Sequence, residues 1–567
     1  MLGRALLPVH RAACIMTAPM EPHCLPFADI PHTTKLFATF VDDFKRVSSY
    51  FAHPPTAAGI DAAAREIPLD LRLRQTMVEI LSEQNRLLAP GGAMDAATSR
   101  NLERLAGGAV AIVTGQQVGL FSGPAYTFYK ALSAIRCAED ATRLGIEAVP
   151  VFWLATEDHD LGEVSHSSWS TRNGLTRYES AAPSEDSGRR VGEIVLGNAI
   201  EAVVGAAAEM LEGPFAAEVS RALQESYTAR DTYGSAFGKL MARLLAGRGI
   251  IFLDQLDVRL HRLFVPSFRW AVQRADQLRD GLLARSRELE GAGFHPQVKV
   301  TRETTLLFWS AAERREPVRS RNGSFVVGDQ ELSTQQLLDA IARQPENFSP
   351  SALLRPVVQD SILPTAAYIG GPAEIAYLAQ AQVVYQELLS RMPAMLPRSS
   401  FTIVEPAIGR FLAQYELDLR DVLAGRQHLR GKMEQKSLPS AVASQFDAGE
   451  EELRRLMQGL EEPLAKLDAT LVESLHGAQA KMLHQFAQLK GKVARAENFR
   501  SGVLDRHERI LIDSLAPDGE LQERTLCLLP FCAAHGPALL DELTSLSSPI
   551  AAGDGKSCVT QHQILLL

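Results

Sequence analysis

The feature that most constrains the fold is a strand–helix–strand pattern in residues 109–155. The apolar run AVAIVT at residues 109–114 has the length and composition of a short buried strand. It is followed by the loop GQQVGLFSG, by a helical stretch over residues 124–142, and by a second apolar run, VPVFWLA. Two strands joined by one helix form a βαβ unit with parallel strands. The pattern therefore predicts an α/β fold with a parallel sheet, whose carboxyl edge usually binds ligands.

Acidic residues follow three of the apolar runs. The run VPVFWLA ends at the cluster TEDHD, GIIFL is followed by Asp254, and SFTIV is followed by Glu405. We expect all three runs to be strands of the sheet, with their acidic ends at one edge. Residues 166–248 and 306–350 interrupt this pattern. We predict that both are insertions, the first mainly helical and the second with short strands.

Residues 453–493 have the clearest periodicity in the chain. Apolar residues recur there in steps of 3, 4 and 4, an eleven-residue repeat of about 3.67 residues per turn. This repeat predicts long, nearly straight helices, with Pro463 starting or breaking one of them. Residues 409–435 are the expected partner in an antiparallel coiled arm. Packing within the chain and dimerisation of two chains are both consistent with such a stripe.

Length and charge limit the possible classes of function. A chain of 567 residues exceeds what one hydrophobic core usually supports, so several structural units are expected. The net charge of −9, without a concentrated basic stripe, argues against nucleic acid as the main partner. The longest apolar run, AVPVFWL, is far shorter than the roughly 20 residues of a membrane helix. We therefore predict no nucleic-acid partner and no membrane association.

The cysteines and the N-terminus bear on the compartment. The six cysteines are dispersed, without a CxxC pair or a zinc-binding spacing, and are predicted to be free thiols of a cytoplasmic protein. Residues 1–25 lack the apolar core of a secretory signal and are predicted to be a disordered leader. A targeting peptide, or a true start at Met16 or Met20, is the alternative.

The loop GQQVGLFSG and the start of the next helix form the first candidate site. Glycines at every fourth position permit close approach of a ligand to the backbone, and a helix N-terminus attracts anions. The loop is neither the dinucleotide fingerprint nor the phosphate-binding P-loop. The residues assigned to this cradle for phosphate or carboxylate are Gly115, Gln116, Gln117, Gly119, Ser122, Gly123, Tyr126 and Lys130. A tight turn without a ligand is the alternative, and Lys130 is equally consistent with an exposed surface lysine.

Glu157, Asp158, His159 and Asp160 form the second candidate site and are the predicted catalytic residues. Four ionisable residues directly after a buried strand must face a cleft, water or one another. Because side chains alternate along an extended chain, Glu157 and His159 are expected to project together, opposite Asp158 and Asp160. One side could bind a substrate amine while the other orients His159 as a general base or as a hydrogen-bond donor to the transition state. A divalent-metal site and a plain charged loop are alternatives, and we assign no metal ligand.

The segment LLRPVVQDSILPTAAYIGGPAEIAYLAQA contains the third candidate site. A glycine turn again opens a helix, with Glu374 and Tyr377 one turn apart. Upstream, Arg355 supplies a cation suited to carboxylate or phosphate, unless it only pairs with Asp360. The candidate binding residues are Arg355, Gln359, Asp360, Gly370, Gly371, Glu374 and Tyr377. We expect both glycine turns to face one cleft.

Six longer segments of the chain match a known family in order: TGQQVGLFSGPAYTFYKALSAI, PVFWLATEDHDLGEV, GFHPQV, LRPVVQDSILPTAAYIGGPAEIAYLAQ, PRSSFTIVE and LAPDGELQER. Through these segments the chain resembles the bacillithiol biosynthesis cysteine-adding enzymes, the cysteine ligase family, from about residue 25 to its end, with a weak match in the C-terminal tail. The resemblance implies a Rossmann-like core similar to nucleotidyltransferases, two connecting insertions, and a coiled-coil arm that makes a homodimer. Through GFHPQV it also adds His295 and Gln297 to the binding residues.

The resemblance also implies a reaction, in which cysteine is joined to glucosaminyl malate to form bacillithiol. Amide formation from a carboxylate in water is uphill, so we expect ATP or another nucleotide to activate the cysteine carboxyl. The GQQVGLFSGP turn is expected to hold phosphates or the cysteine carboxylate, the acidic cluster to act on the attacking amine, and Arg355, Gln359 and Glu374 to seat the malyl or sugar part. A nucleotide-dependent oxidoreductase and a non-catalytic dimeric scaffold are the alternatives.

These expectations divide the chain into eight segments. After the leader, the core comprises residues 26–165, 249–305 and 351–408, interrupted by insertions at 166–248 and 306–350. The helical arm covers residues 409–515, and residues 516–567 are expected to pack on the core.

Overall fold

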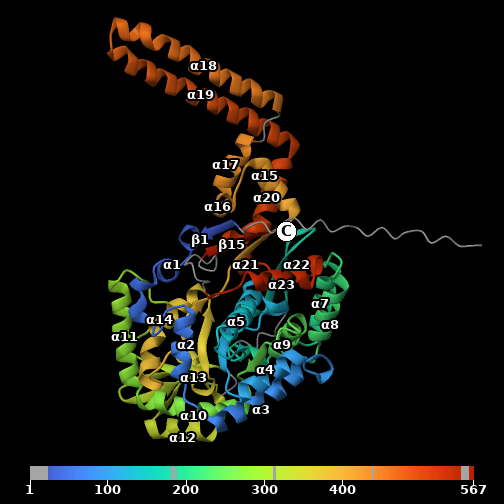
Figure 1. Cartoon of the computed structure of the whole chain (residues 1–567), viewed down its shortest axis with the longest axis vertical. Helices are drawn as coiled ribbons and strands as arrows, with labels where there is room; N and C mark the ends of the chain where they lie inside the picture. The colour runs from blue at the N-terminus through green and yellow to red at the C-terminus, as the bar shows by residue number, and fades with distance from the viewer. Residues whose placement is uncertain (1–22, 181–185, 187, 311–313, 437–439, 551–560) are drawn as a thin grey trace, which may run out of the picture.

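The body of the protein is built around one parallel sheet, and a long helical arm projects from it (Figure 1). The structure is a computed structural model that describes residues 23–180, 186, 188–310, 314–436, 440–550 and 561–567. The predicted leader lies mostly outside these residues. Its last three residues belong to strand β1 (His23–Pro26), so for them the prediction of disorder is wrong.

The central sheet has five parallel strands in the order β13-β12-β2-β3-β6. The bounds are β2 Val110–Gln116, β3 Ala148–Leu154, β6 Ile251–Asp254, β12 Thr365–Gly370 and β13 Ala394–Pro397. Helix α5 (Tyr126–Arg143) joins β2 to β3, which confirms the predicted βαβ unit. From β2 the chain first builds the sheet toward β6 and later returns to add β12 on the other side. In such sheets a ligand crevice forms at the carboxyl ends of the strands where the order reverses, here between β2 and β12.

Helices cover both faces of this sheet, because alternate strand residues point to opposite sides. Ala111 and Val113 of β2 face a core that includes buried residues of α3 (Leu71–Leu88), α4 (Ala96–Ala106) and α10 (Val258–Gln273). Ile112 faces a second core with residues of α5 and α2 (Ala57–Arg65). The parallel sheet covered on both faces is the Rossmann-like arrangement of an α/β protein.

Strand β14 (Phe401–Val404) lies outside the central sheet, and the prediction for SFTIV is wrong in this respect. It forms a three-stranded sheet with β15 (Gln561–Leu566) and β1, in the order β1-β15-β14. Strand β13 takes the edge position of the central sheet instead. Four consecutive buried residues, three of them apolar, are consistent with a strand in either sheet, so the run itself does not specify its partner.

The two interrupting segments carry their own structure. Residues 166–248 contain the hairpin β4 (His166–Thr171) and β5 (Gly174–Glu179), then α7 (Ala199–Glu209), α8 (Ala216–Ser226) and α9 (Tyr233–Leu244). Residues 306–350 contribute most of an antiparallel sheet with the strands β7 Thr304–Trp309, β8 Glu316–Arg321, β9 Ser324–Val327, β10 Gln330–Leu332 and β11 Phe348–Pro350, followed along the chain by α13 (Arg355–Ile362). The domain boundaries stay predictions.

The arm is an antiparallel pair formed by α18 (Ser440–Leu467) and α19 (Thr470–Ser501) (Figure 1). Lys490 Nζ lies 2.7 Å from Asp447 Oδ1, and His476 Nε2 lies 2.6 Å from Glu461 Oε1. The periodic segment therefore folds back on itself, and Pro463 lies inside α18 without ending it.

The predicted partner of the stripe, residues 409–435, lies at the base of the arm instead. It forms α15 (Pro406–Tyr415), α16 (Leu419–Leu423) and α17 (Arg426–Lys436), which pack against α20 (Val503–Leu515). The apolar step from Leu467 to Leu471 is four residues, as within a helix, so the periodicity does not reveal the turn between them.

The remaining helices complete the two faces and the edge of the body. They are α1 Lys35–Asp42, α6 Leu161–Val164, α11 Ala275–Gly291, α12 Thr334–Arg343, α14 Pro372–Leu388, α21 Gln522–Thr525, α22 Leu529–His535 and α23 Pro537–Ser545. Within the described ranges, no helix combines the length and apolarity that crossing a membrane requires.

Candidate functional site

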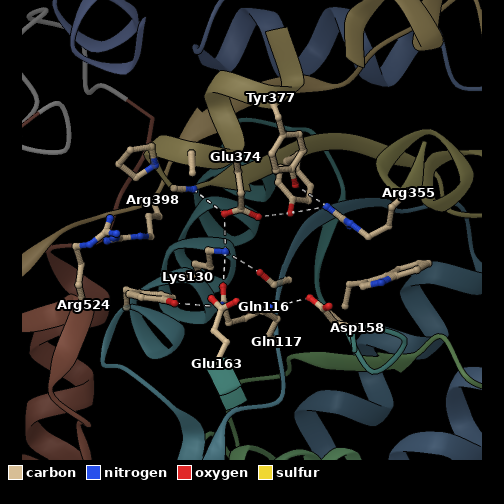
Figure 2. A pocket seen from close by; sticks show the side chains of 18 residues that line it. Gln116, Gln117, Lys130, Asp158, Glu163, Arg355, Glu374, Tyr377, Arg398 and Arg524 are labelled. Carbon is tan, nitrogen blue, oxygen red and sulfur yellow. Dashed lines mark hydrogen bonds and ion pairs between the residues drawn. The ribbon is translucent and has the colours of Figure 1, made fainter. Parts of the chain in front are cut away.

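A cleft of about 410 Å³ lies at the carboxyl ends of β2, β3 and β12, at the crevice expected from the strand order. We call it the main cleft. It is lined by Gly115, Gln116, Gln117, Tyr126, Lys130, Trp153, Ala155, Asp158, Glu163, Arg355, Tyr368, Gly371, Pro372, Ala373, Glu374, Tyr377, Arg398 and Arg524 (Figure 2). Residues from all three candidate segments therefore line one cavity.

The Lys130–Glu374 ion pair lies in the middle of the main cleft (Figure 2). Lys130 Nζ is 2.5 Å from Glu374 Oε2 and also donates to Gly115 O and Gln116 Oε1, both at 2.8 Å. Glu374 accepts further hydrogen bonds from Gly371 N and the Tyr368 hydroxyl. Burial raises the pKa of Glu374, but the charge of Lys130 and these hydrogen bonds outweigh it and hold the pKa below its usual value. Lys130 is thus a buried residue that joins the end of β2 to α14.

Three guanidinium groups line the main cleft around this pair. Arg398 follows β13, packs over the Tyr126 ring and is fixed by buried Glu523 at 2.7 Å. Arg524 reaches the cleft from α21, on the same side in Figure 2. Arg355 lies on the opposite side, at the start of α13.

Arg355 is held by neutral groups. Its guanidinium donates to Tyr377 OH at 2.9 Å, to Tyr368 OH at 3.3 Å and to Gln359 Oε1 at 3.1 Å. Asp360 instead accepts hydrogen bonds from Tyr385 and Gln359, so the alternative of a simple Arg355–Asp360 pair is wrong. A fixed guanidinium without a carboxylate partner in the described part of the chain suits an anionic ligand.

Asp158 is the member of the acidic cluster that faces the main cleft. Its Oδ2 accepts a hydrogen bond of 2.6 Å from Gln117 Nε2, which also donates to Glu163 Oε2 at 2.8 Å (Figure 2). Asp158 Oδ1 accepts from the backbone N–H of His159. The carboxylate is held in place by its neighbours while its side chain stays 31% exposed, as a group that exchanges a proton with a ligand requires.

The other members of the cluster have separate partners, so the predicted alternation of side chains is wrong. Glu157 is buried and binds His261 Nε2 at 2.6 Å. His159 Nδ1 faces Arg315 Nη1 at 3.0 Å, and Asp160 caps the N-terminus of α6. The chain turns directly after β3, and side chains in a turn do not follow the period of a strand.

Burial and neighbouring charges together shift the pKa values of His261 and His159. Burial opposes the charge of His261, but the hydrogen bond and the charge of Glu157 outweigh burial and raise its pKa. Burial and then the charge of Arg315 lower the pKa of His159. His159 is therefore suited to accept a hydrogen bond from Arg315 as a neutral imidazole.

The glycine-rich turn is not an open anion cradle. Residues 120–123 are buried, and Phe121 and Ser122 have φ angles of +53° and +75°. The N–H of Ala125, at the start of α5, donates to Leu526 O at 2.7 Å, and Gly371 N at the start of α14 donates to Glu374. Both helix starts are therefore partly satisfied from within the chain. Of the turn, residues 115–117 line the main cleft and Gly119 lines a recess of about 190 Å³ beside it.

Several predicted binding residues lie away from the cleft. His295 and Gln297 are exposed in the segment after α11 and line neither the main cleft nor its side recess. Gln359 and Asp360 are fully buried behind Arg355, and Gly370 ends β12 beneath the cleft floor. Ser122 and Gly123 lie in the buried part of the turn. Gly371, Glu374 and Tyr377 do line the cleft.

Sequence reasoning missed Arg398, Arg524, Glu163, Tyr368 and Trp153. The segments PRSSFTIVE and LAPDGELQER contained a signal for the two arginines, since each places one arginine in a matching stretch. No local pattern shows that α21, 125 residues after Arg398, returns to the same cleft. In the described segments, no group of three or more His, Cys, Asp or Glu residues is arranged to hold a metal ion.

Comparison with known proteins finds two family models that together match nearly the whole chain. The model "Bacillithiol biosynthesis BshC, N-terminal Rossmann-like domain" matches residues 20–399. The model "Bacillithiol biosynthesis BshC, C-terminal coiled-coil domain" matches residues 401–553.

Three curated relatives are similar over most of their length, and each is named "Putative cysteine ligase BshC". The protein from Koribacter versatilis is 39% identical over 524 residues, which are 92% of this chain and 97% of that protein. The protein from Solibacter usitatus is 35% identical, with 91% and 96% covered. The protein from Salinibacter ruber is 31% identical, with 93% and 97% covered.

Proposed function

The chain belongs to the bacillithiol biosynthesis BshC family and is a ligase, and on this premise we propose that it joins cysteine to glucosaminyl malate through an amide bond. The reaction would form bacillithiol, as the last step of its biosynthesis in the cytoplasm. The observation that carries the proposal is the main cleft, which has the guanidinium groups of Arg398 and Arg524 at one end and the partly exposed Asp158 carboxylate at the other.

Asp158 is the group we assign to the attacking amine. A sugar amine arrives largely as an ammonium ion, and a carboxylate can bind it in that form and accept one proton, which frees the nitrogen lone pair for attack. The second proton would leave to solvent as the amide forms and the activating group departs. Gln117 fixes the Asp158 carboxylate from the floor of the cleft. Glu163 accepts a second hydrogen bond from the Gln117 amide and so places another carboxylate beside Asp158.

Arg398 and Arg524 are the groups we assign to the anionic part of the second substrate. Glucosaminyl malate carries two carboxylates, and guanidinium groups bind carboxylates through paired hydrogen bonds. The two arginines lie across the cleft from Asp158 (Figure 2), so the malyl group and the amine of one molecule would reach opposite ends.

We propose that ATP or another nucleotide activates the cysteine carboxyl. A bound nucleotide would supply a phosphoryl or adenylyl group that turns the carboxylate oxygen into a leaving group. The residues present are consistent with such a ligand, because Arg398, Arg524 and Arg355 can hold phosphate oxygens as well as carboxylates. The protein itself would position the reactants and stabilise charge.

We further propose that the chain forms a homodimer through the arm. Among the described side chains of the two long helices, the exposed large apolar residues are Leu456, Leu460, Leu467, Leu471, Met482 and Leu489. Exposed apolar residues gathered on one element favour a protein–protein contact.

Mass spectrometry of low-molecular-weight thiols tests the proposed function in cells. Cells that carry the gene are compared with cells in which it is deleted, and with the deletion complemented by the parent chain or by the Asp158→Asn variant. We expect bacillithiol only in strains that carry the parent sequence. The deletion strain and the strain with the Asp158→Asn variant should accumulate glucosaminyl malate instead. Equal bacillithiol in the deletion strain would refute the proposal.

A further inference from the structure

A second chamber of about 280 Å³ adjoins the main cleft. It is lined by Ala155, Glu157, Asp158, Gln255, Phe308, Arg315, Pro350, Ala352 and Arg355. We call it the side chamber. Ala155, Asp158 and Arg355 line both cavities, so these three residues lie at the boundary between them, which we call the passage. Its volume is at the lower limit of roughly 300 Å³ for small-molecule pockets, which suits a ligand of few atoms.

Arg315, the residue directly before β8, lines the side chamber. Its Nε donates to Ser349 Oγ at 2.8 Å, Nη2 to Pro350 O at 3.0 Å and Nη1 to His159 Nδ1 at 3.0 Å. The guanidinium also lies 3.8 Å from the centre of the Phe308 ring. These contacts fix the group but occupy three of its five N–H donors, so two remain for a ligand.

Arg315 and Arg355 both lack an ion-pair partner among the described residues, since their hydrogen bonds go to neutral acceptors. Fixed guanidinium groups on the wall of one small cavity are suited to a carboxylate, which accepts paired N–H bonds. The remaining charges of the chamber are negative: Asp158 at the passage and Glu157, whose Oε1 is held by His261.

The side chamber therefore presents two cations and two carboxylates within a space of amino-acid size. An α-amino acid carries the matching pair of charges, a carboxylate and an ammonium on one carbon. The rest of the wall is apolar where Phe308, Pro350 and Ala352 contribute, and a thiol group is compatible with such a surface because it is a weak hydrogen-bonding group.

We propose that the side chamber binds the amino-acid substrate, with its carboxylate on Arg315 and Arg355, its ammonium toward Glu157, and its thiol side chain against Phe308. This assignment rests on the proposed function for the identity of the amino acid. It places the carboxyl carbon at the passage and the acceptor amine in the main cleft, with Asp158 between them. The second insertion thereby acquires a role in substrate selection.

Steady-state kinetics with each substrate varied in turn test the assignment. The variants are Arg315→Ala and Arg315→Lys, and the matched control is Arg314→Ala, which removes the same charge from an exposed neighbouring position. We expect KM for cysteine to rise about 10- to 100-fold in Arg315→Ala, and less in Arg315→Lys, because hydrogen bonds to a charged group are lost. KM for glucosaminyl malate should stay within about twofold of the parent value. A selective rise in KM for glucosaminyl malate, equal rises for both substrates, or no change would overturn the assignment.

Calorimetric titration with L-cysteine and L-serine separates this inference from the proposed function. The titrations use the full chain, with and without a non-hydrolysable ATP analogue, and circular dichroism verifies that each variant is folded. We expect the parent and Arg314→Ala to bind cysteine, Arg315→Ala to bind it at least about tenfold more weakly, and serine to bind more weakly than cysteine because its hydroxyl meets an apolar wall. If cysteine binds in this Arg315-dependent manner but no amide forms, the proposed function fails and the chamber assignment stands. If amide forms but cysteine binding is the same in Arg315→Ala and the parent, the chamber assignment fails alone.

Discussion

Asp158 is the residue on which the proposed chemistry depends most directly. Replacing Asp158 with Asn preserves the shape and the hydrogen bond from Gln117 but removes the proton acceptor. We expect kcat to fall about 10²- to 10⁴-fold, the usual contribution of a general base, with a smaller change in both KM values. Mass spectrometry of the amide product in reaction samples quenched at successive times measures kcat and both KM values.

Asp160→Asn is the matched control for Asp158→Asn, since it makes the same chemical change two residues away. Asp160 caps α6 through Glu163 N at 3.1 Å and does not line the main cleft. Its substitution should leave kcat within about threefold and reduce the free energy of unfolding by at most about 1 kcal/mol. If both variants lose activity equally, Asp158 is not the general base of the reaction.

The buried Glu157–His261 pair predicts a pH dependence of stability. Because Glu157 raises the pKa of His261 above its unfolded value of about 6.5, the stabilisation is fully present below that pH and is lost as the pH rises through the folded-state pKa. Glu157→Gln should cost about 3 kcal/mol at pH 6 and less at pH 9. Urea unfolding of the parent and of Glu157→Gln at pH 6 and pH 9 measures the change in the free energy of unfolding. A cost that stays constant or grows with pH would contradict this account.

For individual residues, the sequence predicted which segments line the site. It did not predict the hydrogen-bond partner of each side chain. Asp158, Glu374 and Arg355 do line the main cleft, and all three follow directly from strand ends and helix starts. The partners of Glu157 and His159 are His261 and Arg315, which are more than 100 residues away along the chain. Contacts of this kind depend on the packing of whole elements, which no local pattern encodes.

The arm is the element whose surface allows the sharpest test. Leu460 and Leu489 are 42% and 51% exposed, and we expect them to lie in a contact between two chains. The double variant Leu460→Glu/Leu489→Glu should be monomeric at concentrations where the parent is dimeric, because buried like charges oppose association. Analytical ultracentrifugation measures the mass, and circular dichroism should show unchanged helix content.

Gln458→Glu is the control for the arm variants, since it adds the same charge at an exposed polar position of α18. It should leave the mass of the assembly unchanged. A parent chain that sediments as a monomer would refute the proposed homodimer, whatever the variants do.

At the element scale, the sequence identified the strands and helices reliably but not all of their partners. The run AVAIVT could be paired with VPVFWLA because one helix joins them and connections in such units are regular. The run SFTIV carries no such link, and the strand that pairs with it, β15, lies about 160 residues later. In the arm, the short turn after Leu467 keeps the four-residue spacing between apolar residues. The periodic pattern therefore runs through the turn, and it does not show where α18 ends and α19 begins.

In the whole molecule, the central sheet and the second insertion contribute to different cavities. The sheet supplies the main cleft at the carboxyl ends of its strands, and the second insertion closes a side chamber against it with Arg315 and Phe308. The two cavities meet at Asp158 and Arg355. Under the proposed function, cysteine and glucosaminyl malate would bind in these two cavities and react where the cavities meet.

Isotope transfer from the cysteine carboxyl group tests whether the chain joins an activated cysteine to glucosaminyl malate. The purified chain is incubated with ATP, glucosaminyl malate and L-cysteine that carries ¹⁸O in both carboxyl oxygens, and the products are analysed by mass spectrometry. The account predicts an amide product that retains one ¹⁸O, with the other in inorganic phosphate or AMP, because the leaving oxygen departs with the activating group. Absence of the amide product, or an amide whose formation transfers no ¹⁸O to a phosphate-containing product, would contradict it.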